Sequence, residues 1–156
     1  MSVQVGQKAP DFTLKTSKME DFKLSDLQGK KNVVVLFVPL AFTSVCTKEF
    51  CSVRDSVSSL QNDNTQVVGI SVDSPFALDA WAAKEGYNFP LLSDFNKTVS
   101  SSYGALYDNL LGFNGVSKRS AFVIDKSGTV RYAWVSEDAR NMPEFDAIRS
   151  CLQQLN

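Results

Sequence analysis

The residues best suited to chemistry lie together in the segment PLAFTSVCTKEFC, residues 39–51. This segment holds two of the three cysteines of the chain, Cys46 and Cys51, and Thr43 lies three positions before Cys46. An apolar run of strand length precedes the segment, and residues at helical spacing follow it, so Cys46 is predicted to lie where a strand gives way to a helix. A thiol in such a place can act as a nucleophile once it is ionised, because the thiolate is the reactive form of cysteine.

The chain contains no histidine. This excludes a Ser-His-Asp triad, a Cys-His pair and any histidine-containing zinc site within one chain. If Thr43 or Ser44 caps the helix, Cys46 lies in its first turn, where unpaired N–H groups and the helix dipole favour an anion. A thiol of pKa about 8.5 is only about 3% ionised at pH 7, whereas one lowered to roughly 6 is about 90% ionised. The alternative is that Cys46 is an inert, small apolar residue.

Apolar patterning predicts the elements on both sides of Cys46. Residues 31–38, KNVVVLFV, form a continuous β-branched and aromatic run that is typical of a strand buried on both faces of a parallel sheet. After Pro39 the apolar spacing becomes helical. The apolar positions are Phe50, Val53, Val57 and Leu60. The strand is therefore expected to end near Val38, and the helix to begin near Thr43.

The remaining elements predict an α/β protein. Strands are expected at 66–73 and 89–92, helices at 75–85, 96–103 and 143–155, an antiparallel hairpin at 120–135 and a small N-terminal β-hairpin within 12–27. Their order gives a mixed central sheet flanked by helices. With 156 residues, 44% of them hydrophobic, residues 1–156 are predicted to form a single domain.

Charge and cysteine content limit the partners and the compartment. Sixteen basic and 17 acidic residues give a net charge of −1, with no long run of one sign, which argues against a nucleic-acid or membrane partner. No apolar stretch approaches the ~18 residues needed to span a bilayer, and the N-terminus lacks a secretory signal, so we expect a cytoplasmic protein. Three cysteines are too few for a disulfide framework, and their odd number would leave at least one of them unpaired. We predict no metal site and no organic cofactor.

Pro39, Thr43 and Cys46 form a P-x-x-x-T-x-x-C motif, and with this motif the sequence resembles the peroxiredoxins over nearly its whole length. The matching stretches are VGQKAPDFTL (5–14), NVVVLFVPLAFTSVCTKE (32–49), NFPLLSDFNKTVSSSYG (88–104) and RSAFVIDKSGTVRY (119–132). PLAFTSVC and FPLLSD make it most similar to the alkyl hydroperoxide reductase E type. The resemblance implies a thioredoxin-like fold and a thiol peroxidase that reduces hydrogen peroxide or organic hydroperoxides.

The resemblance also implies a role for each residue of the site. Cys46 corresponds to the peroxidatic cysteine, Thr43 to the hydroxyl that orients the peroxide, and Pro39 to the residue that shields the thiolate from water. Arg119 matches the arginine beside the sulfur, and Glu49 resembles the residue that positions this arginine. Physically, the leaving oxygen gains negative charge as the thiolate attacks, so backbone N–H groups, Thr43 and Arg119 are expected to donate hydrogen bonds to the peroxide oxygens.

The second half of the reaction must remove the sulfenic acid left on Cys46 before it is oxidised further. Cys51 matches the spacing of the bacterioferritin comigratory type of peroxiredoxin, whereas the alkyl hydroperoxide reductase E type need not have it. In an intact helix the Cα atoms of residues i and i+5 are roughly 8.6 Å apart, while a disulfide needs less than about 7 Å. A Cys46–Cys51 bond therefore requires local unwinding. The alternatives are an external thiol or Cys151, which lies on the apolar stripe of the last helix and is expected to be buried.

Two other functions use the same scaffold. Thiol-disulfide exchange would normally place C-x-x-C at this helix start, but Thr43 occupies the first position of that motif. A redox sensor would react with peroxide once at Cys46, whereas an enzyme would turn over repeatedly with a reductant. By resemblance, the expected partners of the peroxidase are a thioredoxin-type or glutaredoxin-type reductant, or a low-molecular-weight thiol, and a second copy of the chain in a homodimer.

Overall fold

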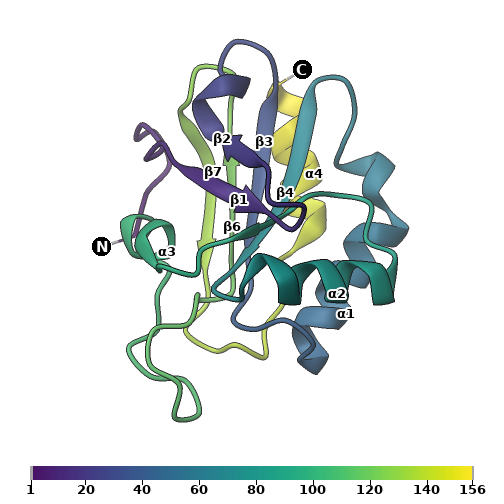
Figure 1. The fold of residues 1–156 in the computed structure, drawn as a ribbon. Coiled ribbons are helices and arrows are strands. Elements are labelled where there is room, and N and C mark those ends of the chain that lie inside the picture. Colours follow the sequence, from purple (N-terminus) through teal and green to yellow (C-terminus); the bar gives the residue numbers. More distant parts are fainter. Residues whose placement is uncertain (1, 156) are drawn as a thin grey trace.

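The computed structural model describes residues 2–155 and consists of one β-sheet with helices on both of its faces (Figure 1). The strands are β1 (Thr13–Thr16), β2 (Asp21–Lys23), β3 (Asn32–Phe37), β4 (Thr65–Ser71), β5 (Leu91–Ser93), β6 (Ser120–Ile124) and β7 (Val130–Val135). The helices are α1 (Ser44–Asp55), α2 (Pro75–Glu85), α3 (Thr98–Ser102) and α4 (Phe145–Leu155), with 3₁₀ turns η1 (Leu24–Leu27) and η2 (Val57–Ser59). The α/β class and the order of elements predicted from the sequence are confirmed.

The sheet is mixed and has the strand order β2-β1-β5-β4-β3-β6-β7. β3 pairs in parallel with β4 and antiparallel with β6, so the strand that leads to Cys46 lies in the interior of the sheet. The β3–α1–β4 segment forms a βαβ unit, because α1 connects two parallel strands. β6 and β7 form the predicted antiparallel hairpin, and β1 and β2 form the predicted N-terminal hairpin.

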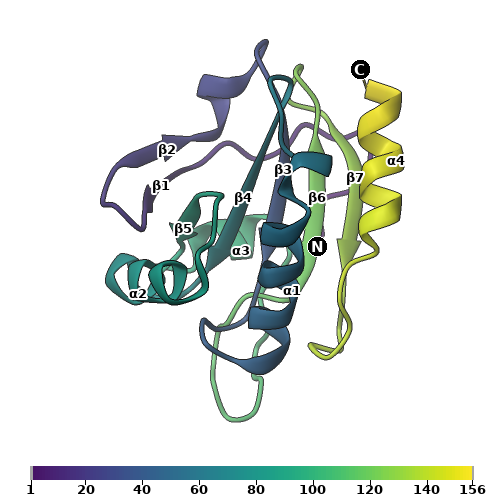
Figure 2. The same ribbon diagram turned by 90° about the vertical axis from the view of Figure 1, so that its right-hand side faces the viewer.

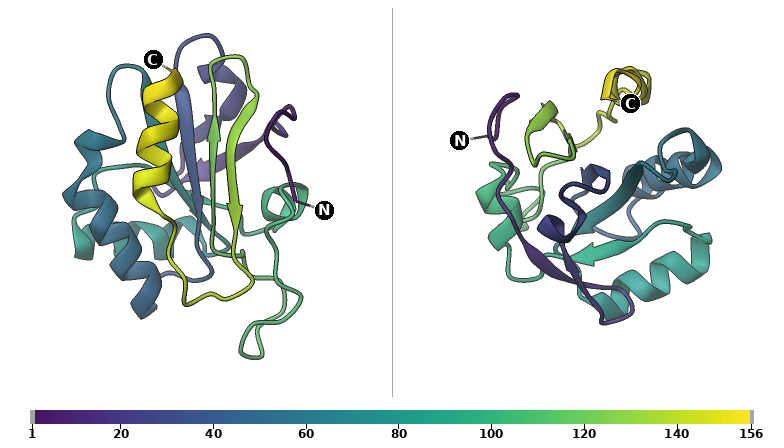
Figure 3. Two further views of the ribbon diagram at one scale, coloured as in Figure 1. Left: turned by 180° about the vertical axis from the view of Figure 1, so that it is seen from behind. Right: turned by 90° about the horizontal axis from the view of Figure 1, so that it is seen from above.

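Alternate residues of β3 supply two separate hydrophobic cores, because successive side chains of a strand point to opposite faces. Val34 and Leu36 pack in the cluster that contains Cys46, with side chains of α1, α2 and α4, and Val33, Val35 and Phe37 pack in the other. Seen from above, α1, α2 and α4 lie on one side of the sheet, and α3 lies on the other side with the N-terminal segment (Figure 3). All six residues of β3 are buried, as its continuous apolar sequence predicts.

Helix α1 packs closely on the sheet through Phe50. A Cβ atom added to Gly69 of β4 would lie 2.6 Å from the Phe50 ring, so this position leaves no space for any side chain. The ring of Phe50 also stacks on Trp81 of α2, with 5.2 Å between the centroids. Phe50 therefore joins α1 to both the sheet and α2.

Several boundaries differ from those expected. The helix predicted at 96–103 is reduced to α3, because Lys97 has a left-handed φ of +65° and the Asp94 carboxylate accepts hydrogen bonds from the N–H groups of Val99 and Ser100. The strand expected at 89–92 begins only at Leu91, since proline lacks the N–H that a sheet ladder needs. Within residues 2–155, no helix is long and apolar enough to cross a membrane.

Candidate active site

The loop between β3 and α1 is anchored to the end of β4. The Asp73 carboxylate accepts a hydrogen bond from the backbone N–H of Ala41 and another from the Ser71 hydroxyl, both at 2.7 Å. Phe42 has a left-handed φ of +68°, a conformation that costs a residue with a side chain roughly 1–2 kcal/mol. The surrounding contacts must offset this cost, which is typical of loops that hold functional groups in a fixed position. No local sequence pattern predicted that Asp73 would hold this loop in place.

Cys46 lies in the first turn of α1. The helix begins at Ser44 with Thr43 in the N-cap position, so Cys46 is its third residue and its N–H group has no acceptor within the helix. The side chain of Cys46 is only 1% exposed. The Thr43 side chain makes no capping hydrogen bond to the helix, and its hydroxyl donates to the Leu40 carbonyl oxygen at 2.8 Å. The sequence predicted the placement of both residues, but not this use of the Thr43 proton.

Arg119 connects Cys46 to Glu49. Its Nη2 donates to the Cys46 Sγ at 3.2 Å, and its Nη1 donates to Glu49 Oε1 at 3.0 Å. Its Nε donates to the backbone carbonyl of Ala139 at 2.8 Å, so every nitrogen of the guanidinium group has a partner. Because Arg119 immediately precedes β6, the neighbour of β3 in the sheet, pairing of the two strands brings it beside the start of α1. The side chain is 2% exposed.

Glu49 is fully buried, and its second carboxylate oxygen, Oε2, has no hydrogen-bond partner. Burial raises the pKa of Glu49 to about 7, although the charge of Arg119 and its hydrogen bond act in the opposite direction. Burial alone would lower the pKa of Arg119, but the charges of Cys46 and Glu49 raise it above its ordinary value. Arg119 therefore keeps its positive charge, and it donates hydrogen bonds to both the Cys46 sulfur and the Glu49 carboxyl group.

The buried carboxyl predicts an unusual dependence of stability on pH. Glu49 titrates near 4.5 when exposed and near 7 when folded, so the folded state binds an extra proton between these values and the free energy of unfolding falls as the pH rises. At 1.36 kcal/mol per pKa unit, the expected loss between pH 5 and 8 is roughly 2 kcal/mol. Urea unfolding of Cys46→Ser, which lacks the thiol beside Arg119, measures this loss. Adding Glu49→Gln removes the carboxyl, and an unchanged pH slope in that double variant would contradict the prediction.

A pocket of about 220 Å³ opens over Cys46. Its lining is largely apolar, and Pro39, Thr43, Cys46 and Arg119 all contribute to it. Leu110, Leu111 and Phe113 complete it from the loop between α3 and β6, and Ala139 and Arg140 from the segment after β7. This loop extends at the same end of the molecule as the beginning of α1 (Figure 2). The sequence patterns predicted no role for this loop, although the consecutive Leu110 and Leu111 beside Gly112 were an available signal.

Comparison with known proteins identifies the scaffold. The AhpC/TSA family model matches residues 5–133 of the chain. The chain belongs to the AhpC/TSA family of peroxiredoxins. Peroxiredoxins of this family are peroxidases that use a thiol to reduce peroxides, and the activity of this chain is therefore thiol-dependent peroxide reduction.

Individual relatives agree with this assignment. The alkyl hydroperoxide reductase E of Mycobacterium tuberculosis is 39% identical over 133 residues, 84% of each chain. The putative peroxiredoxin bcp of Coxiella burnetii is 43% identical over 137 residues, 86% of this chain and 89% of that protein. The crystal structure of the peroxidoxin BcpB from M. tuberculosis superimposes with a TM-score of 0.87 at 31% identity, covering 99% of both chains. The predicted thioredoxin-like fold is confirmed.

The other two thiols of the peroxiredoxin lie outside the pocket over Cys46. Cys51 is half-buried on the same helix, and its Sγ donates to Glu85 Oε2 at 3.4 Å. Cys151 is half-buried on α4 and packs against the core, so it is less buried than its apolar stripe predicted. Burial raises the pKa of Cys151 above its ordinary value, which makes that thiol a weaker nucleophile at neutral pH.

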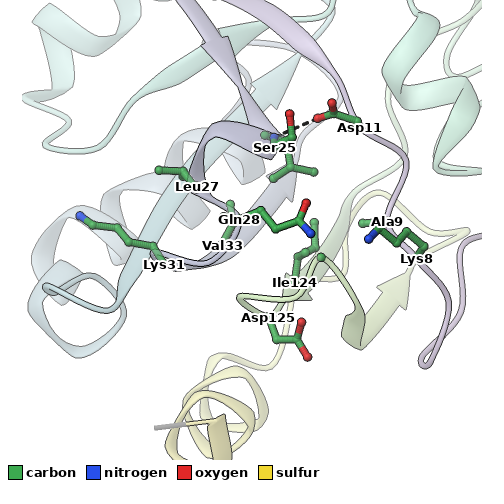
Figure 4. A pocket seen from close by; sticks show the side chains of 12 residues that line it. Lys8, Ala9, Asp11, Ser25, Leu27, Gln28, Lys31, Val33, Ile124 and Asp125 are labelled. Carbon is green, nitrogen blue, oxygen red and sulfur yellow. Dashed lines mark hydrogen bonds between the residues drawn. The ribbon is translucent and has the colours of Figure 1, made fainter.

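A second pocket, of about 230 Å³, lies at the opposite end of β3 and β6 (Figure 4). Val33 and Ile124 line it together with the side chains of Lys8, Gln28 and Asp125, and it contains no thiol. This pocket is therefore separate from the sulfur chemistry of the peroxiredoxin. In the part of the chain that the structure describes, no three side chains of histidine, cysteine, aspartate or glutamate lie close enough together to hold a metal ion.

Proposed function

We propose that Cys46 is the peroxidatic cysteine. Its thiolate attacks one oxygen of a hydroperoxide, the O–O bond breaks as the S–O bond forms, and the leaving oxygen takes a proton to become an alcohol or water. The sulfur is oxidised to a sulfenic acid and the peroxide is reduced. The observation that supports this assignment is the 3.2 Å contact between Arg119 Nη2 and the Cys46 Sγ at the start of a helix, where a cation and free N–H groups stabilise a thiolate without histidine.

The neighbouring side chains have distinct roles in this step. Arg119 and the N–H groups of the first turn donate to the oxygens on which charge develops. The Thr43 oxygen accepts the O–H of the peroxide, because the hydroxyl proton of Thr43 is already donated to Leu40. Glu49 positions Arg119 through its 3.0 Å hydrogen bond. Pro39, buried beside the thiol, keeps water from the sulfur.

The substrates of this site are organic hydroperoxides as well as hydrogen peroxide. The pocket over Cys46 is lined mainly by apolar side chains, among them Leu110, Leu111 and Phe113, which favour an alkyl group. A relative at 39% identity is named an alkyl hydroperoxide reductase, which agrees with this preference.

Cys51 resolves the sulfenic acid by forming a disulfide with Cys46, and a thioredoxin-type or glutaredoxin-type protein reduces that disulfide. The proposal is supported by the position of Cys51 on the same helix, about 1.4 turns beyond Cys46, and by its partial exposure. A one-cysteine cycle, in which an external thiol attacks Cys46 directly, is the alternative. Both cycles need a reductant, as the membership of the chain in the peroxiredoxins implies.

A non-reducing digest separates the two cycles. The protein is oxidised with one equivalent of peroxide, alkylated and cleaved with trypsin, which cuts after Lys48 and so separates Cys46 from Cys51. We expect residues 32–48 joined to residues 49–54 by a disulfide. A persistent sulfenic acid on Cys46, with no such joined peptide, would contradict the role of Cys51 and leave the one-cysteine cycle. Cys51→Ser is the control in which the joined peptide cannot form.

The functional unit is a dimer of single-domain chains, residues 1–156, in the cytoplasm. Phe42, Leu111 and Phe113 expose large apolar side chains around the pocket, and a second copy of the chain would cover them. The three cysteines are free, which fits a reducing compartment.

A further inference from the structure

Thr47, the residue directly after Cys46, is held by the helix that packs beside α1. The indole Nε1 of Trp81 donates to the Thr47 hydroxyl at 3.2 Å, and the Tyr87 hydroxyl donates to the Thr47 backbone carbonyl at 3.5 Å. Trp81 lies on α2, and Tyr87 follows its end, where Gly86 with a φ of +67° turns the chain back toward α1. Together, Trp81 and Tyr87 are called the α2 latch.

The α2 latch also contacts the second thiol. The Tyr87 oxygen lies 3.9 Å from the Cys51 Sγ, which is itself hydrogen-bonded to Glu85 at the end of α2. The ring of Tyr87 packs edge-on against Phe50, with 5.8 Å between centroids. Burial, followed by the contact with Cys51, raises the pKa of Tyr87 well above its ordinary value, so its hydroxyl keeps the proton that it donates. The Tyr87 hydroxyl therefore contacts both the Thr47 carbonyl and the Cys51 sulfur, in the turn of α1 that separates Cys46 from Cys51.

This turn is the part of α1 that has to open. Cys46 and Cys51 both lie within an unbroken helix, where Cα atoms five residues apart are roughly 8.6 Å from each other and too far apart for a disulfide. By the helical pattern, the N–H of Cys51 pairs with the carbonyl of Thr47, the same oxygen that Tyr87 binds. Opening the helix between the thiols therefore breaks the contacts of Thr47 with the α2 latch.

The contacts that resist this opening from outside α1 respond differently to oxidation. On one side, Arg119 binds the Cys46 sulfur, and this contact weakens once the thiolate becomes a neutral sulfenic acid. On the other side, the α2 latch binds Thr47, which oxidation leaves unchanged. After the first chemical step, the α2 latch, the Arg119–Glu49 ion pair and the Cys51–Glu85 contact still hold the helical turn from outside α1. Of these, the α2 latch is the one that binds the backbone of the turn, at the Thr47 carbonyl.

We propose that the α2 latch sets the rate at which Cys51 reaches the oxidised Cys46, and so divides the sulfenic acid between disulfide formation and further oxidation. In disulfide formation, the Cys51 sulfur attacks the Cys46 sulfur, the S–O bond breaks, and hydroxide leaves with the thiol proton as water. The Cys51 sulfur is oxidised and the Cys46 sulfur is reduced. If the turn stays closed, a second peroxide molecule oxidises the sulfenic acid to sulfinic acid. This inference rests on the proposed function of Cys46 and Cys51; Trp81, Tyr87 and Thr47 are positioning residues in it.

Two nearly isosteric variants release the α2 latch. Tyr87→Phe removes the hydroxyl and keeps the ring packed, and Thr47→Val removes the acceptor of Trp81 and keeps a β-branched residue in the helix. Tyr103→Phe is the matched control, because its hydroxyl donates to the Pro10 carbonyl at 2.7 Å on the opposite face of the sheet. Thr47→Val and Tyr103→Phe each remove one hydrogen bond, and Tyr87→Phe removes the bond to the Thr47 carbonyl together with the 3.9 Å contact with the Cys51 sulfur. The loss of one such bond changes an opening equilibrium by about five-fold.

The experiment follows the full-length protein after it is mixed with hydrogen peroxide, with rapid acid quenching, alkylation and mass spectrometry. We expect Tyr87→Phe and Thr47→Val each to form the Cys46–Cys51 disulfide about five-fold faster, to accumulate correspondingly less sulfinic acid at high peroxide, and to form sulfenic acid at the wild-type rate. Hydrogen exchange of the amides of residues 47–51 in the reduced protein should be accelerated by the same factor. Tyr103→Phe should leave all these rates unchanged.

The possible failures are distinguishable. The proposed role of the α2 latch would be overturned if both latch variants formed the disulfide at the wild-type rate. It would also be overturned if Tyr103→Phe accelerated disulfide formation equally. Neither result would affect the proposed function. Sulfenic acid on Cys46 that never becomes a disulfide would overturn both the α2 latch and the role of Cys51, but not that of Cys46. If no sulfenic acid forms on Cys46, the proposed function itself fails and the α2 latch fails with it.

Discussion

Cys46→Ser is expected to abolish peroxide turnover, with a loss of at least about 10³-fold in rate. A serine hydroxyl has no anionic form at neutral pH comparable to a thiolate, so neither Arg119 nor the helix start can produce a nucleophile from it. The fold should persist, because serine fits the space of the buried thiol and its hydroxyl can accept the hydrogen bond from Arg119. Peroxide consumption in the presence of a dithiol reductant measures the loss, and thermal unfolding checks the fold.

Cys151→Ser is the matched control for this substitution. It also replaces a thiol by a hydroxyl, but on α4 and outside the pocket over Cys46, so turnover should stay within about two-fold of the wild-type rate. If Cys46→Ser kept substantial turnover, the reacting sulfur would have to be assigned elsewhere. Loss of turnover in Cys151→Ser would instead assign the resolving thiol to Cys151 and contradict the role of Cys51.

Arg119→Ala is expected to produce the second-largest effect. Removing a hydrogen-bond donor aimed at the developing charge of a transition state costs about 10²–10³-fold in rate, and here the same group also stabilises the thiolate. The substitution also leaves Glu49 buried without a cation, and breaking a buried ion pair in this way typically costs about 3–5 kcal/mol of stability. Stopped-flow measurement of the reaction with peroxide and urea unfolding record the two effects separately.

A double variant distinguishes the chemical role of Arg119 from its structural role. Arg119→Ala with Glu49→Gln replaces the buried carboxylate by a neutral amide, so most of the lost stability should return. The slow reaction with peroxide should remain, because Cys46 still lacks its cation. A double variant that recovered the wild-type rate would show that Arg119 acts only by keeping Glu49 satisfied.

The strand-to-helix junction at Cys46 could be predicted because its signals are local. The apolar run of β3, the change to helical spacing and the motif formed by Pro39, Thr43 and Cys46 are all visible within residues 31–60. The boundary errors have local physical causes that a pattern does not reveal. The left-handed conformation of Lys97, for example, shortens α3, and no periodicity of apolar residues reports a single φ angle.

The contacts of Arg119 with Cys46 and Glu49 were expected only from the resemblance to the peroxiredoxins, because local sequence patterns do not report pairing between distant segments. Glu49 lies between Lys48 and Phe50 in the sequence, and a glutamate in a helix is usually solvated, yet Glu49 is fully buried. Only the pairing of β3 with β6 places Arg119, 70 residues away, against it. The contacts of Cys51 with Glu85 and Tyr87 likewise cross from α1 to α2 and have no signature in either segment.

The most direct test of the central assignment is to locate the sulfur that peroxide oxidises first. Trypsin places the three thiols in three peptides, residues 32–48, 49–54 and 150–156, so a sulfenic-acid trap such as dimedone can be mapped without ambiguity. The reduced wild-type protein is mixed with one equivalent of peroxide and an excess of the trap, and then digested. Modification of residues 32–48, dependent on peroxide and at up to one adduct per chain, is the predicted result. Initial modification of residues 49–54 or 150–156 instead would contradict the assignment of Cys46.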